Sequence, residues 1–232
     1  ERSQSRTYPE GTLAANILGF VNSDGQGQGG LEYQFDTVLA GIDGERTFSS
    51  VTGITTADQQ VTPAVDGNHL QLTIDRDIQW VAQDAIAAQV KKTKAQSGTV
   101  IVMNAKTGEI LAMATAPTFD PNDLSKATAR NLGNRVLGDV HEPGSTGKVM
   151  TMAAVIEAGT LTPDSKITVP ARLKRADKTF KDAHTHAKLR LTLTGVLAKS
   201  SNIGSILAAE TIDGQYLYDT LKRFGVGEKS GL

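Results

Sequence analysis

The pattern of apolar and polar positions changes near residue 65. Residues 1–65 are rich in Gly, Thr, Ser and Gln, and the stretch SDGQGQGG at 23–30 holds four glycines, whose backbone freedom favours an irregular loop. Beyond this region apolar residues recur at regular intervals. We therefore expect a non-catalytic first region over 1–65 and a second, independently folded region over 66–232.

The second region begins with patterns for a strand, a helix and a hairpin. HLQLTI at 69–74 alternates like a half-buried strand, and Asp75 can cap a helix that places Trp80 in the core. The apolar residues of this helix recur at helical spacing: Ile78, Val81, Ala82, Ala85 and Ile86. The β-prone runs 99–103 and 110–114 flank the polar connection NAKTGE, which predicts a hairpin.

A further helix follows the stretch HEPGSTGKVM at 141–150. Val149, Met152, Ala153 and Ile156 would share one helical face, and Gly159 can end the helix in a left-handed conformation. Ser145 would then lie at or near the first turn of a buried helix. Two more helices are expected over 193–198 and 203–211.

Composition excludes several classes of protein. With 24 basic and 25 acidic residues and a net charge of -1, the chain has no basic surplus for nucleic acid. Zero cysteines exclude disulfides, thiolate zinc sites and cysteine nucleophiles, and nothing in the sequence requires a metal or a cofactor. The chain lacks a run of about 20 apolar residues and opens on ERSQSRTYPEG without a signal-like core. We interpret it as a fragment whose anchor would lie upstream.

Gly147 and Lys148 give the stretch 141–150 the look of a phosphate-binding loop. Such a loop has the pattern G-x-x-x-x-G-K-[ST], with a hydroxyl that binds magnesium. Here Glu142 stands at the first glycine, where its carboxylate would repel phosphate, and Val149 replaces the hydroxyl residue. These two departures argue against a nucleotide site.

The same stretch also fits an activated serine. Ser145 and Lys148 are three residues apart and would lie one above the other on a helix. An amine partly removed from water can accept the proton of the hydroxyl, and a helix N-terminus favours a developing oxyanion. S-x-x-K also arises by chance, so Lys148 as an ordinary solvated residue remains the alternative.

A second motif raises the weight of the nucleophile interpretation. In AKSSNIG at 198–204, Ser200 and Asn202 follow Ser145 by 55 and 57 residues. A serine hydroxyl can relay a proton, and a side-chain amide can orient a lysine and a substrate peptide. The structural alternative is a helix end followed by the cap of the next helix; both can hold together.

These motifs resemble the class B penicillin-binding proteins, of the septal, division-associated type. S-x-x-K followed by S-x-N is a signature of that group, and EPGST-G-K, Asn134-Arg135 and SSNIG are similar to its motifs. RTYPEGTLAANILGF and GGLEYQFDTVLAGIDG resemble the linker region, and VIVMNAKTGEILAMA resembles the first hairpin of the catalytic domain. The resemblance implies an α+β fold, an antiparallel sheet flanked by helices, behind a small pedestal. Gly147 departs from the frequent aromatic of the family.

The resemblance also implies roles for four residues. Ser145 would attack the carbonyl of a terminal D-Ala-D-Ala, Lys148 would take its proton, Ser200 would pass a proton to the departing D-Ala, and Asn202 would hold Lys148 and the donor peptide. The expected partners are peptidoglycan stem peptides, β-lactams and cell-division proteins. The expected location is the cell membrane, with the catalytic domain extracytoplasmic.

The third motif of the family, K-T-G, has two poor candidates. Lys106-Thr107-Gly108 precedes the nucleophile and occupies the hairpin connection, and Lys229-Ser230-Gly231 follows Asn202 by only 27 residues. We therefore expect the cleft wall that carries this motif to lie outside the chain, and we expect the chain alone to react with penicillin poorly or not at all. A β-lactamase using the same serine, and a non-catalytic β-lactam sensor or scaffold, remain alternatives.

Two smaller features carry weaker predictions. His184 and His186 have the spacing of two metal ligands on a strand, but without a third ligand nearby a solvated or hydrogen-bonded pair is favoured. A run of basic residues predicts a solvated hairpin rather than a polyanion site: Arg172, Lys174, Arg175, Lys178 and Lys181.

Overall fold

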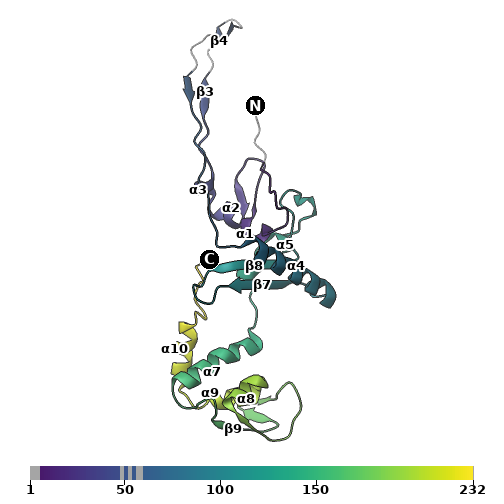
Figure 1. Cartoon of the computed structure of the whole chain (residues 1–232), viewed down its shortest axis with the longest axis vertical. Coiled ribbons are helices and arrows are strands. Elements are labelled where there is room, and N and C mark those ends of the chain that lie inside the picture. The colour runs from purple at the N-terminus through teal and green to yellow at the C-terminus, as the bar shows by residue number, and fades with distance from the viewer. Residues whose placement is uncertain (1–5, 48–49, 52–53, 56–59, 232) are drawn as a thin grey trace. The chain divides into compact units, whose positions relative to one another are not determined.

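The fold mixes helices with antiparallel strand pairs, as expected for an α+β protein (Figure 1). The computed structural model describes residues 6–47, 50–51, 54–55 and 60–231. Of the expected linker region 1–65, residues 1–5, 48–49, 52–53 and 56–59 lie outside the described part. The chain forms two compact units, residues 1–139 and 140–232. Each unit has its own strands and its own packed side chains.

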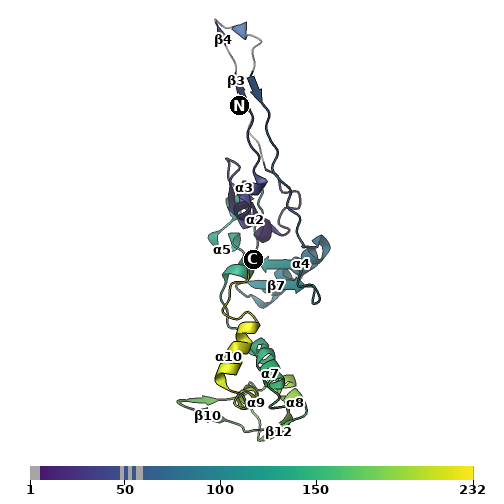
Figure 2. The ribbon, with the colours of Figure 1, turned by 90° about the vertical axis from the view of Figure 1, so that its left-hand side faces the viewer.

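The first unit opens with short elements and a two-stranded ribbon. β1 (Phe20–Val21) pairs with β2 (Gly27–Gly29), β3 (Glu45–Thr47) with β6 (Gln60–Thr62), and β4 (Ser50–Val51) with β5 (Ile54–Thr55). The two-stranded ribbon, in which β3 and β4 are labelled, is clear in both ribbon views (Figures 1 and 2). The helices of this part are α1 (Ala15–Leu18), α2 (Gly30–Gln34) and α3 (Asp36–Leu39).

The glycine-rich stretch 23–30 is therefore only partly a loop, which corrects the prediction. Its last residues form β2 and begin α2. A Cβ on Gly27 would lie 2.0 Å from the carbonyl oxygen of Glu32, and one on Gly19 would lie 1.6 Å from that of Gly29. These glycines allow backbones to approach closely, which composition alone does not distinguish from loop flexibility.

The second half of the first unit is a helix packed on a hairpin. β7 (Gly98–Met103) and β8 (Ile110–Ala116) pair antiparallel, as predicted. α4 (Arg76–Thr93) begins at Asp75, whose carboxylate accepts from the Ile78 N–H and confirms the predicted cap. Small helices follow: η1 (Leu124–Lys126), α5 (Ala129–Leu132) and α6 (Arg135–Gly138). The packed residues are Ala82, Ala112 and Ala114, flanked by Ile78, Ile86, Val100 and Val102.

The inward face of α4 differs from the prediction. Trp80 is 61% exposed and Val81 is 58% exposed, while Gln79 is buried. The Gln79 amide accepts from the Met113 N–H at 2.8 Å and donates to the Met113 carbonyl at 3.2 Å. This paired contact with β8 turns Gln79 inward and Trp80 outward, so the expected core position of Trp80 is wrong.

The strand expected over residues 69–74 is also absent from the described residues. An alternating segment becomes a strand only when a neighbour completes its hydrogen-bond ladder. Here the Thr73 hydroxyl donates to the Ile110 carbonyl, and the Asp75 N–H donates to the Leu111 carbonyl. These two contacts tie the segment to the start of β8 without forming a ladder.

The second unit holds the elements around the predicted serine. They are η2 (Gly144–Thr146), α7 (Gly147–Glu157), α8 (Leu193–Ala198), α9 (Asn202–Ala209) and α10 (Gly214–Arg223). β9 (Lys166–Val169) pairs with β12 (Leu189–Thr192), and β10 (Leu173–Arg175) pairs with β11 (Lys178–Phe180) in the hairpin predicted for the basic run. One core joins these helices to the strands: Met152, Val155, Ile167, Val169, Leu173, Leu193, Val196, Ile203 and Ala208.

α7 buries a different face from the one predicted. Met152 and Val155 enter the core, whereas Val149 is 56% exposed and Ile156 is 45% exposed. The packing of α7 against α9 selects this face, and the sequence of α7 by itself does not reveal its partner. Gly159 has φ +70° just after the helix, as predicted for a left-handed end.

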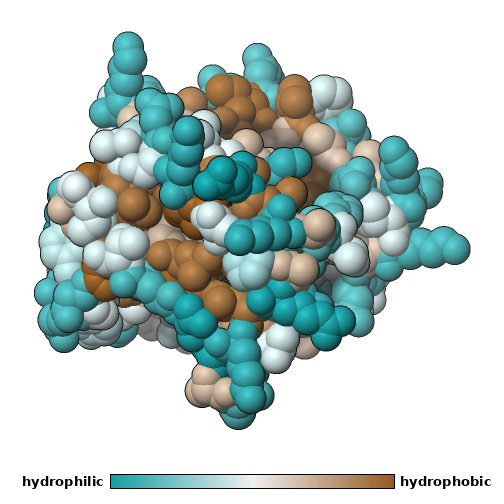
Figure 3. Space-filling view, turned by 90° about the horizontal axis from the view of Figure 1, so that it is seen from below, coloured by the Kyte–Doolittle hydropathy of each residue, from teal (hydrophilic) through white to brown (hydrophobic). Residues whose placement is uncertain are grey.

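One face of the molecule mixes polar and apolar residues. Figure 3 shows hydrophilic and hydrophobic residues interspersed on one face. Among the described residues, the helices are too short or too polar for any of them to cross a bilayer.

Candidate active site

Ser145 and Lys148 meet at the start of α7. Ser145 lies in the turn η2, and Lys148 belongs to the first turn of α7. Gly144 precedes Ser145 with φ +59°, a conformation that favours glycine. The Lys148 amine donates to the Ser145 hydroxyl at 3.1 Å. The geometry expected from their spacing is therefore present, with Ser145 exposed and Lys148 half-buried.

Ser200 completes this cluster from the connection between α8 and α9. Its hydroxyl donates to the Ser145 oxygen at 2.9 Å. The Lys148 amine donates to the Ser200 hydroxyl oxygen at 3.0 Å and to its carbonyl oxygen at 2.9 Å. Ser200 has φ +52°, in the left-handed region that residues with a side chain seldom adopt.

The three side chains form a closed triangle of hydrogen bonds. An ammonium group has three N–H donors, and Lys148 directs all three at oxygens of Ser145 and Ser200. A proton that leaves the Ser145 hydroxyl has two acceptors within hydrogen-bond distance, the Ser200 oxygen and, when the lysine is a neutral amine, the Lys148 nitrogen. This arrangement can activate a serine nucleophile and relay its proton.

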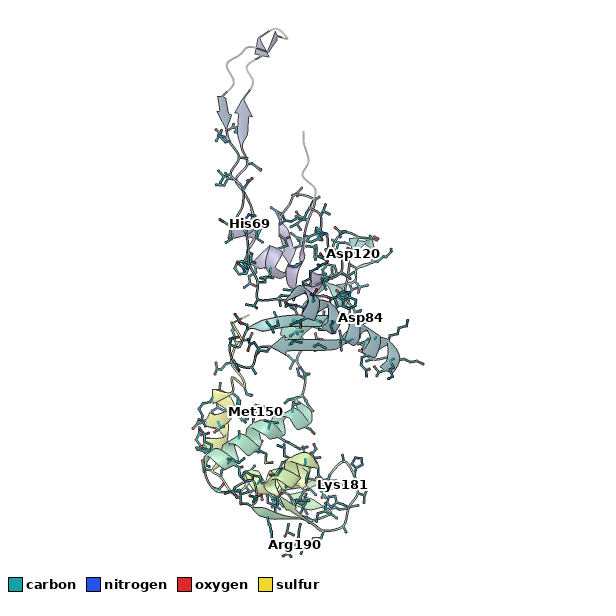
Figure 4. The ribbon with its side chains drawn as sticks, in the orientation of Figure 1. His69, Asp84, Asp120, Met150, Lys181 and Arg190 are labelled. Carbon is teal, nitrogen blue, oxygen red and sulfur yellow. The ribbon has the colours of Figure 1, made fainter. Side chains whose placement is uncertain are left out.

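Asn202 lies beside the cluster and is held differently from what we expected. It is the first residue of α9 and is exposed. Its amide nitrogen donates to the Lys181 carbonyl at 3.0 Å (Figure 4 labels Lys181). The helix cap is the neighbouring Ser201, whose hydroxyl accepts from the Gly204 N–H. The role of Asn202 as a holder of Lys148 stays a prediction.

Asp182 is a half-buried acid of this region that the sequence reasoning missed. Its carboxylate accepts from the Ser201 hydroxyl at 2.7 Å, from the Ile203 N–H at 2.9 Å and from the His186 ring at 3.0 Å. Burial raises the pKa of Asp182, but the hydrogen bonds from Ser201, Ile203 and His186 outweigh burial and lower the pKa below its usual range. The only sequence signal was the pair of histidines beside it.

The two histidines separate in the structure. His186 is 14% exposed, and its ring nitrogens contact the Asp182 carboxylate at 3.0 Å and the Ala187 carbonyl at 2.6 Å. His184 is exposed. The segment that carries them is not a strand, so the expected common face does not form. Within the described residues, three or more candidate ligands do not gather anywhere in a metal-binding arrangement.

Neither candidate for the third motif resembles a cleft wall. Lys106, Thr107 and Gly108 form the turn between β7 and β8 in the first unit, where Gly108 has φ +79° and Thr107 bonds to Glu109. Residues 229–231 lie outside helices and strands. Residues 106–108 therefore serve as a hairpin turn, and residues 229–231 serve as a connecting segment.

Comparison with known families assigns the chain to a protein family. The profile of the penicillin binding protein transpeptidase domain matches residues 98–232, which is more than half of the chain. The chain belongs to the penicillin-binding protein transpeptidase family. A second profile, the penicillin-binding protein dimerisation domain, matches residues 1–72. The family resemblance seen in the sequence is thereby confirmed.

Relatives of this penicillin-binding protein match it along its whole length. It is 39% identical to penicillin-binding protein PbpB of Mycolicibacterium smegmatis, covering 100% of this chain and 36% of that protein. It is 37% identical to peptidoglycan D,D-transpeptidase FtsI of Escherichia coli, covering 100% and 39%. The chain thus spans little more than a third of the length of these curated relatives.

Solved structures show the same fold. The apo form of penicillin binding protein 3 from Mycobacterium tuberculosis superposes with a TM-score of 0.83 at 36% identity, covering 95% of this chain and 47% of that one. The same protein complexed with ampicillin gives 0.84 at 38% identity, covering 95% and 46%. The expected penicillin-binding transpeptidase fold is confirmed, in the part that this chain spans.

The family profiles and the compact units place the domain boundary at different residues. The dimerisation profile ends at residue 72, the transpeptidase profile begins at residue 98, and the compact units meet between residues 139 and 140. The boundary at residue 65 stays a prediction for this penicillin-binding protein. Ser145, Lys148, Ser200 and Asn202 all fall inside the transpeptidase profile and inside the second unit.

Proposed function

We propose that this chain carries the nucleophile and the proton-transfer groups of a peptidoglycan D,D-transpeptidase. The observation that supports this most directly is the closed triangle of Ser145, Lys148 and Ser200, with contacts of 2.9 to 3.1 Å. Each member can exchange a proton with the other two. The names of the relatives agree, since the Escherichia coli relative is called a peptidoglycan D,D-transpeptidase.

Acylation follows from this geometry. The Ser145 oxygen attacks the carbonyl carbon of the penultimate D-Ala of a stem peptide, and its proton passes to Lys148. The bond to the terminal D-Ala then breaks, and Ser200 delivers a proton to the nitrogen of the departing D-Ala while Lys148 reprotonates Ser200. The products are an acyl-Ser145 ester and free D-Ala.

Deacylation uses the same groups in reverse. An amine of a neighbouring stem peptide attacks the acyl-Ser145 carbonyl and gives up a proton through Ser200 and Lys148, which restores the Ser145 hydroxyl. A β-lactam would acylate Ser145 but retain its leaving group, so the ester would persist. The penicillin binding protein 3 structures complexed with aztreonam and ampicillin support binding of this class of inhibitor.

Partners and location follow from the proposed reaction. The substrates would be stem peptides ending in D-Ala-D-Ala, which requires a catalytic domain on the outer side of the cell membrane. Cell-division proteins would contact the protein in the septum, and an anchor upstream of residue 1 would hold it at the membrane. Asn202, exposed at the start of α9, would contact the donor peptide.

The nucleophile is tested by replacing Ser145 in the full-length protein. The Ser145→Ala variant should form no covalent adduct with a fluorescent penicillin and should not cross-link stem peptides in vitro, because the attacking oxygen is gone. The Ser125→Ala variant, which also removes an exposed hydroxyl, should label normally. Peptide mass spectrometry of the labelled wild type should find the adduct on Ser145.

Three other results would change the proposed function. An adduct on a residue other than Ser145 would contradict the proposal. Rapid hydrolysis of a chromogenic β-lactam by the wild type would identify a β-lactamase, and a stable adduct without stem-peptide cross-linking would identify a sensor.

A further inference from the structure

Ser200 holds its place in the triangle with an unfavourable backbone. Its φ of +52° lies in the left-handed region, and Ser200 is neither glycine nor a turn asparagine. Ser200 follows the end of α8, where its N–H donates to the Leu197 carbonyl and the Ser201 N–H donates to the Val196 carbonyl, the bonds of a helix end with a left-handed residue. Because this residue is not a glycine, further contacts have to stabilise the conformation. The Lys148 amine contacts both the hydroxyl and the carbonyl of Ser200, so this conformation sets two of the three contacts of the amine.

The three residues after Ser200 form hydrogen bonds with one short segment, residues 181–182. The Lys181 carbonyl accepts from the Asn202 amide, and the Asp182 carboxylate accepts from the Ser201 hydroxyl and from the Ile203 N–H. Three consecutive residues are thus held from residues 181–182, which follow β11. On the other side, the Ser201 N–H donates to the Val196 carbonyl at the end of α8.

Helix capping by itself does not account for Asp182. Ser201 already caps α9 through the Gly204 N–H. Asp182 lies 19 residues before Ser201, and one of its carboxylate oxygens accepts a hydrogen bond from the hydroxyl of this cap residue. The Asp182 side chain is only 10% exposed. The negative charge of Asp182 is compensated by hydrogen bonds from Ser201, Ile203 and His186. His186, four residues further on, supplies one of the pairing contacts.

We propose that Asp182 is a positioning residue for acylation: it locks Ser201 and Ile203 so that Ser200 keeps its left-handed backbone against Lys148, and His186 holds the Asp182 carboxylate in place. The proposal rests on the proposed function for its kinetic consequence. Its structural consequence, the position of Ser200, does not depend on that function.

Asp182→Asn is the main test, made in the full-length protein. Asparagine keeps the size of the side chain and can still accept from the Ile203 N–H, but it loses the charge and its NH₂ group faces the His186 ring. The matched control is Asp177→Asn, the same change five residues upstream, at the exposed turn of the hairpin that precedes Asp182.

The expected effect is on the reaction step. For a penicillin, Asp182→Asn should lower the acylation rate constant by about 10 to 100-fold, because small misplacements of reacting groups have effects up to that size. The dissociation constant of the non-covalent complex should stay within about twofold of wild type, because the Asp182 carboxylate contacts Ser201, Ile203 and His186 rather than Ser145, Lys148 or Ser200. Asp177→Asn should match the wild type in both quantities.

His186→Gln gives a second, gentler variant. It leaves the Ser201 and Ile203 contacts of Asp182 in place, so it carries the test if Asp182→Asn does not fold. It should lower the acylation rate constant by less than Asp182→Asn does. The double variant should be no slower than Asp182→Asn alone, because both changes act through one carboxylate.

A crystal structure of Asp182→Asn separates this inference from the proposed function. We expect Ser200 to leave the left-handed region and the Lys148 contact with the Ser200 carbonyl to lengthen beyond hydrogen-bond distance. If the wild type reacts with penicillin while Asp182→Asn reacts equally fast, the inference fails and the proposed function stands. If the wild type does not react, the position of Ser200 in the variant structure still decides the inference, and an unchanged Ser200 overturns it.

Discussion

Lys148 is the residue on which the proposed chemistry depends. Its amine contacts the Ser145 hydroxyl and both oxygens of Ser200, so it can reach the nucleophile and the relay group at once. Lysine is suited to this task because its amine can lose and regain a proton, whereas a guanidinium stays protonated in proteins. The site therefore requires a lysine rather than a positive charge alone.

Lys148→Arg should abolish most of the activity while keeping the charge. We expect the penicillin acylation rate to fall by about 10²–10⁴-fold, the usual contribution of a general base. Lys199→Arg, at the exposed end of α8, should leave the rate unchanged. Stopped-flow measurement with a fluorescent penicillin checks both variants, and near wild-type acylation by Lys148→Arg would exclude Lys148 as the base.

Asp182 makes a pH-dependent contribution to stability. Its pKa is lowered in the folded state from the ordinary value of 3.8, so folding favours the ionised form. The stabilisation is fully present above pH 3.8 and is lost as the pH falls through the lower, folded-state pKa. We expect the melting temperature of the wild type to exceed that of Asp182→Asn above pH 3.8, and the difference to shrink in stronger acid. A difference that grew on acidification would contradict this sign.

At the scale of elements, hydrogen bonds rather than apolar pattern decide how α4 is oriented. Gln79 enters the interior because its amide satisfies both the N–H and the carbonyl of Met113. Trp80, the next residue, is consequently directed to the surface. A periodicity argument ranks tryptophan above glutamine for burial and therefore selects the wrong face.

Gln79→Ala should destabilise the first unit measurably. It leaves the Met113 N–H and carbonyl without their partner inside the packed helix and hairpin, which costs about 1–3 kcal/mol for a buried group. Gln89→Ala, on the exposed side of the same helix, should change stability by less than about 0.5 kcal/mol. Denaturant unfolding measures both, and equal stabilities would show that the Gln79 contacts are dispensable.

At the scale of the whole molecule, the chain carries the first two motifs of its family but covers only 36 to 39% of its curated relatives. Neither of its two K-[ST]-G sequences lies in a strand, since one forms a hairpin turn and the other a connecting segment. The family resemblance implies that the third motif and its strand help to hold the substrate and the oxyanion. That the cleft wall with the third motif lies outside residues 1–232 stays a prediction.

The chain of residues 1–232 should accordingly react slowly with penicillin. Loss of one oxyanion donor alone lowers a rate by about 10²–10³-fold. Labelling of the isolated chain and of the full-length protein with the same fluorescent penicillin compares them directly, with Ser145→Ala as the blank in each. Labelling of the isolated chain at the full-length rate would show that the 232 residues already form a working cleft.

Features that depend on neighbours in the sequence were predictable. The Asp75 cap, the hairpin of β7 and β8, the helix α8 and the approach of Lys148 to Ser145 all involve residues close along the chain. Hydrogen bonds and side-chain stacking at three- or four-residue spacing are fixed by local backbone geometry. The amino-acid sequence therefore determined the two motifs and the family to which they belong.

Only the tertiary structure decided which distant groups meet. The inward faces of α4 and α7, the direction of the Asn202 amide, and the contact of Asp182 with Ser201 depend on packing between elements. The left-handed backbone of Ser200 combines both kinds of contact. The N–H groups of Ser200 and Ser201 bond to the Leu197 and Val196 carbonyls at the end of α8, and α7 and residues 181–182 add contacts from distant parts of the chain. Contacts across 19 to 55 residues leave no periodic trace in the sequence, because their geometry exists only after the core has formed.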